Sequence, residues 1–323
     1  MFVGIQRPML EIKVHYSLIK FIVMTSHVIK LLRPLIGILT TSLFVVFTLI
    51  VFVPLMPLAL LKWLVPFAPW QVVCNRWLDW LASHWMDANA RHQGLLLPTQ
   101  LQVEGLDGVS INEWYMLIAN HQSWVDILVL LRVFNRRIPY LKFFLKQSLI
   151  WVPLLGLAWW ALEFPFMKRY SKAEIAKNPA LKGKDIEKTR QACEKFRHNP
   201  VTIINFLEGT RFTLAKYAQQ NSTYTHLLMP KAGGLAFTLA AMNGQLHSLL
   251  DVTLYYPEGR PSYWDYACGK VGAIQIHVRQ LPIPPEMLGD YSEDAEFRVR
   301  FQAWVNQIWQ EKDALLQQIQ ASR

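Results

Sequence analysis

The sequence is poor in charged residues and in cysteine. Charged side chains make up 17% of the 323 residues and hydrophobic ones 52%, whereas an average soluble domain carries roughly 25% charged residues. The three cysteines include no C-x-x-C pair, which argues against a disulfide framework and a cysteine-based zinc site. No Gly/Ser/Pro-rich linker divides the chain. The composition therefore predicts one main domain in contact with lipid.

The sequence also lacks two common hydrolytic motifs. It contains no G-x-S-x-G elbow, which weakens the case for a covalent hydrolase, and no H-E-x-x-H pair, so that no metal is expected. What it has in excess is positive charge, +10 overall, which predicts an anionic partner. Ten Lys and Arg between residues 168 and 197 face four acidic residues; they form either a solvated helical face or a docking surface for anionic headgroups, coenzyme A phosphates or a carrier protein. No nucleic-acid motif is present, and nucleic acid is not an expected partner.

One uncharged stretch is long enough for a membrane. Residues 34–61 are 28 consecutive residues without a charge, roughly 42 Å as a helix against a hydrocarbon core of about 30 Å. Pro54 and Pro57 interrupt the stretch, so one straight span is not the natural interpretation. We favour a re-entrant hairpin that turns back near these prolines; a crossing followed by a second one is the alternative.

Basic residues before this stretch predict its orientation. Lys20, Lys30 and Arg33 place the N-terminal side in the cytoplasm by the positive-inside rule. A hairpin would keep the rest of the chain on that side, whereas a single crossing would export it. Residues 63–85 contain five tryptophans and are predicted to form an amphipathic helix at the membrane interface.

The remainder alternates short apolar runs with helical patterns, which indicates an α/β domain with a mixed sheet flanked by helices. Strands are predicted at 101–104, 115–119, 162–166, 202–206, 250–255 and 273–279, and helices at 124–133, 185–197, 232–242 and 294–319. The expected organisation is a basic flank (1–33), a membrane anchor (34–90), a catalytic domain (100–290) and a C-terminal helix (291–323). The pattern does not predict the strand order.

The most informative motif, A-N-H-Q-S-W-V-D, ends at Asp126, where a strand gives way to a helix. His121 and Asp126 would lie on different faces of one helix, but if His121 precedes the helix and Ser123 is its N-cap, the carboxylate can reach the imidazole. Such a pair suits a general base that deprotonates a hydroxyl attacking a thioester, with the carboxylate fixing the tautomer. The alternative is a capping box of Ser123 and Asp126, with His121 an ordinary turn residue.

Three further loops follow apolar runs and present cations: F-P-F-M-K-R, F-L-E-G-T-R and M-P-K-A-G-G. Arginine can hold phosphate through two parallel hydrogen bonds, and a cation at a helix N-terminus favours anions. Each loop alone could be a simple turn with a surface cation. Together with the histidine turn, they predict a site at one edge of the sheet. The cations are Lys168, Arg169, Arg211 and Lys231.

These four blocks, in this order, resemble those of the glycerolipid acyltransferases, especially the 1-acylglycerol-3-phosphate acyltransferases of bacterial inner membranes. The resemblance covers residues 101–257. It implies that His121 and Asp126 are catalytic and that the four cations hold the substrate phosphate. The remaining motif residues would be largely structural; they are Asn120, Ser123, Glu208, Gly209 and Thr210.

The resemblance also implies a reaction. A fatty acyl group would pass from acyl-CoA or acyl-acyl-carrier protein to the sn-2 hydroxyl of lysophosphatidic acid, with no acyl-enzyme and no cofactor, beside membrane lipids on the cytoplasmic side. Lys168 replaces an acidic residue common in bacterial relatives, and F-L-E-G-T-R-F is closer to lysocardiolipin-type members. Another lysophospholipid acceptor therefore stays open. So does a non-catalytic lipid-binding protein, although the intact His–Asp pair argues against it.

Overall fold

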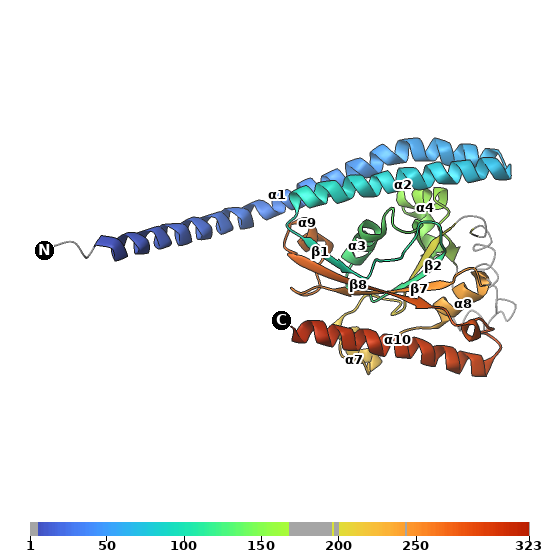
Figure 1. The fold of residues 1–323 in the computed structure, drawn as a ribbon. Helices are drawn as coiled ribbons and strands as arrows, with labels where there is room; N and C mark the ends of the chain where they lie inside the picture. Colours follow the sequence, from blue (N-terminus) through green and yellow to red (C-terminus); the bar gives the residue numbers. More distant parts are fainter. Residues whose placement is uncertain (1–5, 168–195, 197–199, 243, 323) are drawn as a thin grey trace.

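The computed structural model describes residues 6–167, 196, 200–242 and 244–322, with side chains described from residue 31 onward. A six-stranded sheet lies between two layers of helices (Figure 1). All neighbouring strands are parallel except the last pair of the chain, β7 and β8, which is antiparallel. The predicted mixed sheet is confirmed. In spatial order its strands are β1 (Gln100–Glu104), β8 (Ala273–Pro282), β7 (Ser248–Tyr255), β2 (Tyr115–Ala119), β6 (Thr202–Phe206) and β3 (Leu141–Phe143).

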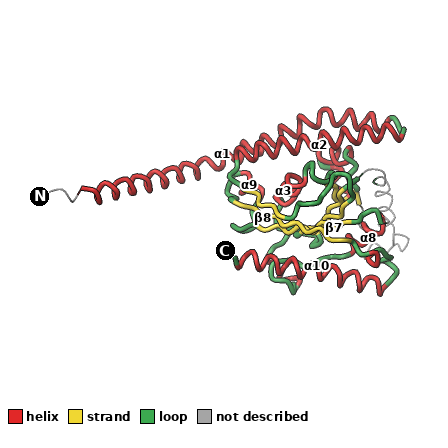
Figure 2. Tube along the Cα trace, viewed as in Figure 1, coloured by secondary structure: helices red, strands yellow, loops and turns green. Residues whose placement is uncertain are grey.

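Helices cover both faces of the sheet (Figure 2). A long hairpin of α1 (Gln6–Leu64) and α2 (Ala68–Leu96) lies over one face, and the first part of α1 extends beyond the rest of the molecule (Figure 1). The same face carries α3 (Val125–Phe134), α4 (Leu155–Ala161) and α9 (Tyr263–Ala267). The opposite face carries α7 (Leu214–Gln220), α8 (Gly233–Met242) and α10 (Ala295–Ala321). Short pieces complete the chain: β4 (Leu145–Lys146) paired with β5 (Phe166–Met167), and 3₁₀ turns at Gln147–Trp151 and Pro285–Met287.

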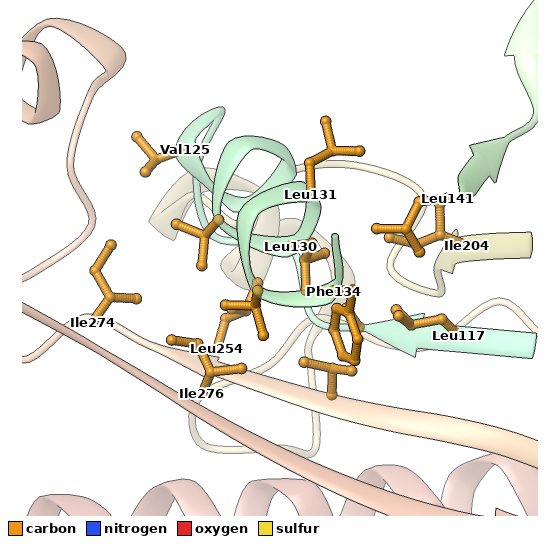
Figure 3. Packing of buried hydrophobic residues seen from close by; sticks show 14 of the residues in the cluster. Leu117, Val125, Leu130, Leu131, Phe134, Leu141, Ile204, Leu254, Ile274 and Ile276 are labelled. Carbon is orange, nitrogen blue, oxygen red and sulfur yellow. The ribbon is translucent and has the colours of Figure 1, made fainter. Parts of the chain in front are cut away.

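The buried strands contribute side chains to two hydrophobic cores, one on each face of the sheet. Every residue of β2 is buried, and successive side chains of a strand point to opposite faces. Leu117 packs with the α3 layer (Figure 3), whereas Met116 and Ile118 pack with α8 and α10. A strand covered on both faces is apolar throughout. The sheet edge beyond Ala119 is consequently a fixed platform for the residues that follow β2.

The prediction that the chain turns back near Pro54 and Pro57 is wrong. Both prolines lie inside α1, which continues to Leu64, and the chain reverses at residues 65–67. A proline in a helix interior removes one backbone hydrogen bond and disfavours the helix. Here Leu55 and Ala59 are buried against α2 and α4, and we infer that this packing offsets the loss. Within the described residues, Leu31–Leu64 is long and apolar enough to cross a membrane.

The Trp-rich stretch forms an amphipathic helix, as predicted, although Trp63 belongs to α1. Buried residues recur along α2 every three or four positions, which is the spacing of one helical face. Trp77 and Trp80 are exposed. The buried residues of α2 are Cys74, Leu78, Ala82, Met86, Asn89, His92 and Gln93.

Most strand predictions are confirmed, and one is wrong. The predicted strand at 162–166 lies mostly in a turn after α4, and only Phe166 belongs to a strand. Glu163 has a φ of 57°, and Pro165 has no N–H to donate, which prevents a ladder. The three-residue β3 was not predicted, because Leu141–Phe143 is too short to show a period. The helix predicted at 185–197 falls almost entirely outside the described residues.

Candidate active site

His121 lies in the turn between β2 and α3, and Asp126 lies in the first turn of α3. The imidazole Nδ1 is 2.8 Å from Asp126 Oδ2. Asp126 is fully buried, whereas 12% of the His121 side chain is exposed. Because His121 precedes the helix, the five-residue spacing does not separate the two groups. They meet as the motif predicted.

Four donors surround the Asp126 carboxylate. Besides His121, the backbone N–H groups of Gln122 (2.6 Å) and Ser123 (2.8 Å) donate to Oδ2, and the Tyr256 hydroxyl donates to Oδ1 at 2.6 Å. Burial, with the charge of Asp126, raises the pKa of Tyr256 well above its usual value, so the hydroxyl keeps its proton. Hydrogen bonds to the charged form favour a carboxylate. Asp126 is thus held in one orientation with Oδ2 facing the imidazole.

Half of a capping box coexists with this pair. The Ser123 N–H donates to Asp126, but the Ser123 hydroxyl accepts from the Val125 N–H (3.1 Å) and donates to the Pro261 carbonyl (2.5 Å). The N-cap is Trp124, not Ser123 as predicted. The reason is that the Asp126 carboxylate itself satisfies the free N–H groups before the helix. The capping interpretation and the His–Asp pair are therefore compatible.

The turn after β6 packs directly on the histidine turn. The imidazole of His121 stacks on the ring of Phe206, with centroids 4.0 Å apart at 18°. The Phe212 N–H donates to the His121 carbonyl at 2.8 Å. On the other side, the Asn120 side chain exchanges two hydrogen bonds with the backbone of Leu254, of 2.9 and 2.8 Å. Asn120 thereby ties the ends of β2 and β7 together.

The E-G-T-R turn brings cations to the same edge. Gly209 has a φ of 67°, a conformation that side chains disfavour, and a Cβ there would lie 3.4 Å from Lys231 Nζ. The Lys231 N–H donates to the Leu207 carbonyl at 2.8 Å. The guanidinium of Arg211 lies 4.3 Å from the ring centroid of Trp124, within range of a cation–π contact.

Glu208 of this turn is fully buried. Neither carboxylate oxygen has a hydrogen-bond partner at normal geometry. Burial raises the pKa of Glu208 to about 8, although the nearby N–H groups of His121 and Leu228 act against this rise. The side chain is therefore largely neutral at pH 7.

The structure thus brings His121, Asp126, Arg211 and Lys231 together, while Lys168 and Arg169 lie outside the described residues. Four polar residues at this edge were missed: Gln122, Lys216, Tyr256 and Arg260. Lys216 donates to the Thr210 hydroxyl (2.6 Å) and the Arg211 carbonyl (3.0 Å). Tyr256 directly follows a predicted strand, but only the pairing of β7 with β2 shows that it reaches this edge.

An apolar cavity of about 240 Å³ lies beneath the helical hairpin. Ile127 and Leu128, the two residues after Asp126, line one wall, and Phe44 and Phe52 of α1 line another. Nearly all of its wall is aliphatic or aromatic. Such a cavity accepts hydrocarbon and disfavours polar groups.

The buried His–Asp pair and the cation-bearing turn lie within a segment that matches a known protein family. Residues 100–279 match a family model described as Acyltransferase. The match covers more than half of the chain and includes the His121 turn, the E-G-T-R turn and Tyr256. The chain belongs to the acyltransferase family, as its sequence blocks predicted.

Curated relatives match at 27% identity. The probable 1-acyl-sn-glycerol-3-phosphate acyltransferase 5 of Arabidopsis thaliana is 27% identical over 65% of this chain and 54% of its own length. The human 1-acyl-sn-glycerol-3-phosphate acyltransferase gamma is 27% identical over 63% and 52%, respectively. The 2-acyl-1-lysophosphatidylinositol acyltransferase of Saccharomyces cerevisiae is 27% identical over 62% and 60%. The chain spans about half the length of the curated relatives it matches.

A solved structure shares the fold. The crystal structure of the 1-acyl-sn-glycerophosphate (LPA) acyltransferase PlsC from Thermotoga maritima aligns with a TM-score of 0.53 at 17% identity. The alignment covers 88% of this chain and 98% of that one, so it reaches beyond residues 100–279. At this identity the likeness concerns the fold alone.

Proposed function

We propose that this protein transfers a fatty acyl group from acyl-CoA or acyl-acyl-carrier protein to the sn-2 hydroxyl of lysophosphatidic acid, which gives phosphatidic acid. The observation that carries the proposal is the 2.8 Å contact between His121 Nδ1 and the buried Asp126 carboxylate. With Nδ1 donating to Asp126, Nε2 is the nitrogen available to accept a proton. His121 is thereby suited to act as a general base at neutral pH.

The chemical step is a direct transfer. His121 Nε2 takes the proton of the acceptor hydroxyl as its oxygen attacks the thioester carbonyl, the C–S bond breaks, and the thiol leaves with a proton. Asp126 stabilises the imidazolium that forms in between. The Ser123 hydroxyl is engaged by Pro261 and Val125, which argues against its use as a nucleophile. No covalent acyl-enzyme and no cofactor is needed.

Two features fit the rest of such a substrate. Arg211 lies on Trp124 and Lys231 lies against Gly209, and both are suited to the acceptor phosphate. We extend this role to Lys168 and Arg169 on the strength of their motif. The apolar cavity lined by Ile127 and Leu128 is suited to an acyl chain, because burying hydrocarbon contributes about 0.8 kcal/mol per methylene group.

We further propose that the α1–α2 hairpin is embedded in one leaflet, with the active site on the cytoplasmic side of a bacterial inner membrane. Much of α1 is apolar and exposed, including Leu35, Ile50 and Val53. Yet α1 also contacts α2, α4 and α9 along the globular domain. A helix fixed along the domain in this way favours an in-plane arrangement, because a perpendicular one would carry the domain into the bilayer.

A different acceptor is the second candidate. A lysophosphatidylinositol acyltransferase is as similar to the chain as the 1-acyl-sn-glycerol-3-phosphate acyltransferases, at 27% identity. The chemistry around His121 would be the same, and only the headgroup contacts would differ.

A labelled-donor assay with an acceptor panel tests the proposal. Detergent-solubilised protein is given labelled palmitoyl-CoA with lysophosphatidic acid, lysophosphatidylinositol or lysocardiolipin. We expect His121→Ala to abolish transfer while circular dichroism stays unchanged, and Arg211→Ala to raise mainly the acceptor KM. Near-normal turnover by folded His121→Ala would refute the general-base mechanism. Transfer to another lysolipid but not to lysophosphatidic acid would favour the second candidate.

A further inference from the structure

The loop after β7 carries a guanidinium group that no sequence block contains. Arg260 stacks on the ring of Phe212 at 3.7 Å from its centroid, and its Nε donates to the side-chain oxygen of Gln122. The loop is fixed to the histidine turn, because the Ser123 hydroxyl donates to the Pro261 carbonyl. Arg260 is therefore held beside the His–Asp pair by two residues of the motif itself.

This guanidinium lies at a small pocket. The pocket has a volume of about 160 Å³ and is lined by Asn120, Gln122, His226, Tyr256 and Arg260, among others. The Gln122 Nε2 is buried and has no hydrogen-bond partner, which is costly unless a ligand supplies an acceptor. Among the described residues, no carboxylate forms a salt bridge with Arg260.

We propose that this pocket is a second anion subsite, in which Arg260 and Gln122 bind a phosphate group of a substrate. The proposal rests on the acyltransferase function proposed above. A guanidinium can meet phosphate through two parallel N–H donors, and its stacking on Phe212 limits the orientations it must give up on binding. The Gln122 amide adds a further donor. Burial lowers the pKa of Arg260, yet a guanidinium remains charged at neutral pH.

Arg211 and Lys231 are not among the residues that line this pocket. Arg211 lies on Trp124, which precedes α3 on one face of the sheet. The Arg260 pocket is instead bounded by Leu316 of α10, which covers the other face. One anionic group of the reactants would be bound at each place. The second phosphate can come from the donor, as in coenzyme A or phosphopantetheine, or from the acceptor headgroup.

Binding measurements that need no turnover test the subsite. Full-length detergent-solubilised wild type, Arg260→Gln and Arg260→Lys are titrated calorimetrically with coenzyme A and with hexanoyl-lysophosphatidic acid. Arg300→Gln is the matched control. Arg300 is exposed on α10, and its ion pair with Glu296 is long, at 4.0 Å. We expect Arg260→Gln to weaken one of the two ligands about tenfold or more, and Arg260→Lys to restore it in part. The control should bind both ligands as the wild type does.

The pattern of losses identifies the source of the phosphate. Weaker coenzyme A binding alone assigns it to the donor, and then kcat/KM should fall for acyl-CoA but not for an acyl N-acetylcysteamine thioester, which has no phosphate. Weaker lysophosphatidic acid binding alone assigns it to the acceptor. Unchanged binding of both ligands by folded Arg260→Gln would overturn the proposal. If the wild type shows no transfer but Arg260→Gln still loses binding, the subsite holds and the proposed function fails.

Discussion

At the scale of single residues, the Asp126 carboxylate is the centre of the site. It accepts from His121, from two backbone N–H groups and from Tyr256. Three of these donors come from the motif itself, and the sequence predicted the His–Asp contact because the spacing allowed it. Tyr256 lies 130 residues away in the chain. No local pattern could have shown that its hydroxyl reaches Asp126, because that contact depends on the packing of β7 against β2.

A Tyr256 variant tests whether its hydrogen bond to Asp126 controls how strongly the carboxylate holds the proton on His121. In Tyr256→Phe, Oδ1 loses its donor and the buried carboxylate becomes more basic, so the proton is held more firmly on the neighbouring imidazole. We expect kcat to fall about tenfold, the acid limb of the kcat/KM profile to move to higher pH, and the acceptor KM to change little. Stopped acyl-transfer assays at several pH values measure all three.

Tyr263→Phe is the control for this substitution. The Tyr263 hydroxyl is 3.4 Å from Thr41 of α1 and does not contact Asp126. This variant should keep the wild-type profile. If Tyr256→Phe loses activity equally at every pH, Tyr256 supports the fold and does not tune the pair.

Glu208 predicts a pH dependence of stability. Its pKa is about 8 in the folded protein, against 4.5 for an ordinary glutamate, so the folded state binds more protons between these values. Stability from this group is therefore complete below about pH 4.5 and is lost as the pH rises toward 8. The loss amounts to a few kcal/mol at most, since one pKa unit corresponds to about 1.4 kcal/mol.

The neutral amide of Glu208→Gln removes this dependence. We expect the Tm of the variant minus that of the wild type to grow from pH 5 to about pH 8 and then to level off, as measured by thermal unfolding in detergent. A difference that stays constant over this range would contradict the raised pKa. Sequence alone could not predict this behaviour, because E-G-T-R gives no sign that its glutamate is buried.

At the scale of elements, the prediction succeeded where a period was long enough to see. The helix α10 was predicted at 294–319 and spans Ala295–Ala321, after Asp294 caps its first turn. Its inward face packs under the sheet through Phe297, Phe301 and Trp309. The helical pattern did not predict that this inward face carries a lysine. Lys312 is fully buried, although a helical pattern would place a lysine toward solvent.

Lys312 links α10 to the sheet. Its Nζ donates to the Val252 carbonyl (2.5 Å) and the Thr253 hydroxyl (3.1 Å), and it lies 2.7 Å from Asp251 Oδ1. The Asp251 contact is an ion pair and not an aligned hydrogen bond. Arg279 pairs with the other carboxylate oxygen at 2.6 Å. Burial lowers the pKa of Lys312, and the charge of Asp251 opposes this shift.

Removing one charge of this buried pair should destabilise the protein more than removing both charges. We expect Lys312→Met to lower the free energy of unfolding by about 3 kcal/mol, because Asp251 keeps a charge without its buried partner. The double variant Lys312→Met/Asp251→Asn should recover part of the loss. Denaturant unfolding of Lys312→Met, Asp251→Asn, the double variant and the wild type gives the coupling energy. Losses that simply add would show that the two charges do not depend on each other.

At the scale of the whole molecule, composition predicted contact with lipid but not its geometry. Exposed apolar residues gather on α1, at the connection to α2 and on the α4 side, where Trp151 is 85% exposed. Gly37 of α1 approaches α9 so closely that a Cβ would lie 2.6 Å from Cys268 Sγ. From Gly37 to Ala59, α1 is therefore packed on the domain. A sequence pattern reports which residues are apolar, whereas only the packing of α1 shows which of them remain free for a membrane.

The hairpin connection offers the sharpest test of this geometry. Trp63 and Phe67 flank it and are 66% and 63% exposed, so their replacement leaves the cores intact. Burying one aromatic side chain contributes roughly 1.5–3 kcal/mol. We therefore expect Trp63→Asp/Phe67→Asp to lower partitioning onto anionic vesicles at least about tenfold, as measured by co-sedimentation. Transfer to a soluble short-chain acceptor in detergent should persist, because neither residue contacts the His121 turn.

A matched pair on the opposite side of the sheet separates a specific membrane face from general hydrophobicity. Val299 and Ala303 are exposed on α10, which lies across the sheet from α1 (Figure 1). If the hairpin face alone meets lipid, Val299→Asp/Ala303→Asp should partition as the wild type does. Equal losses for both double variants would mean that the protein contacts the bilayer on both sides of its sheet. An in-plane hairpin could not produce that result, whereas a domain drawn into the bilayer by a crossing α1 could.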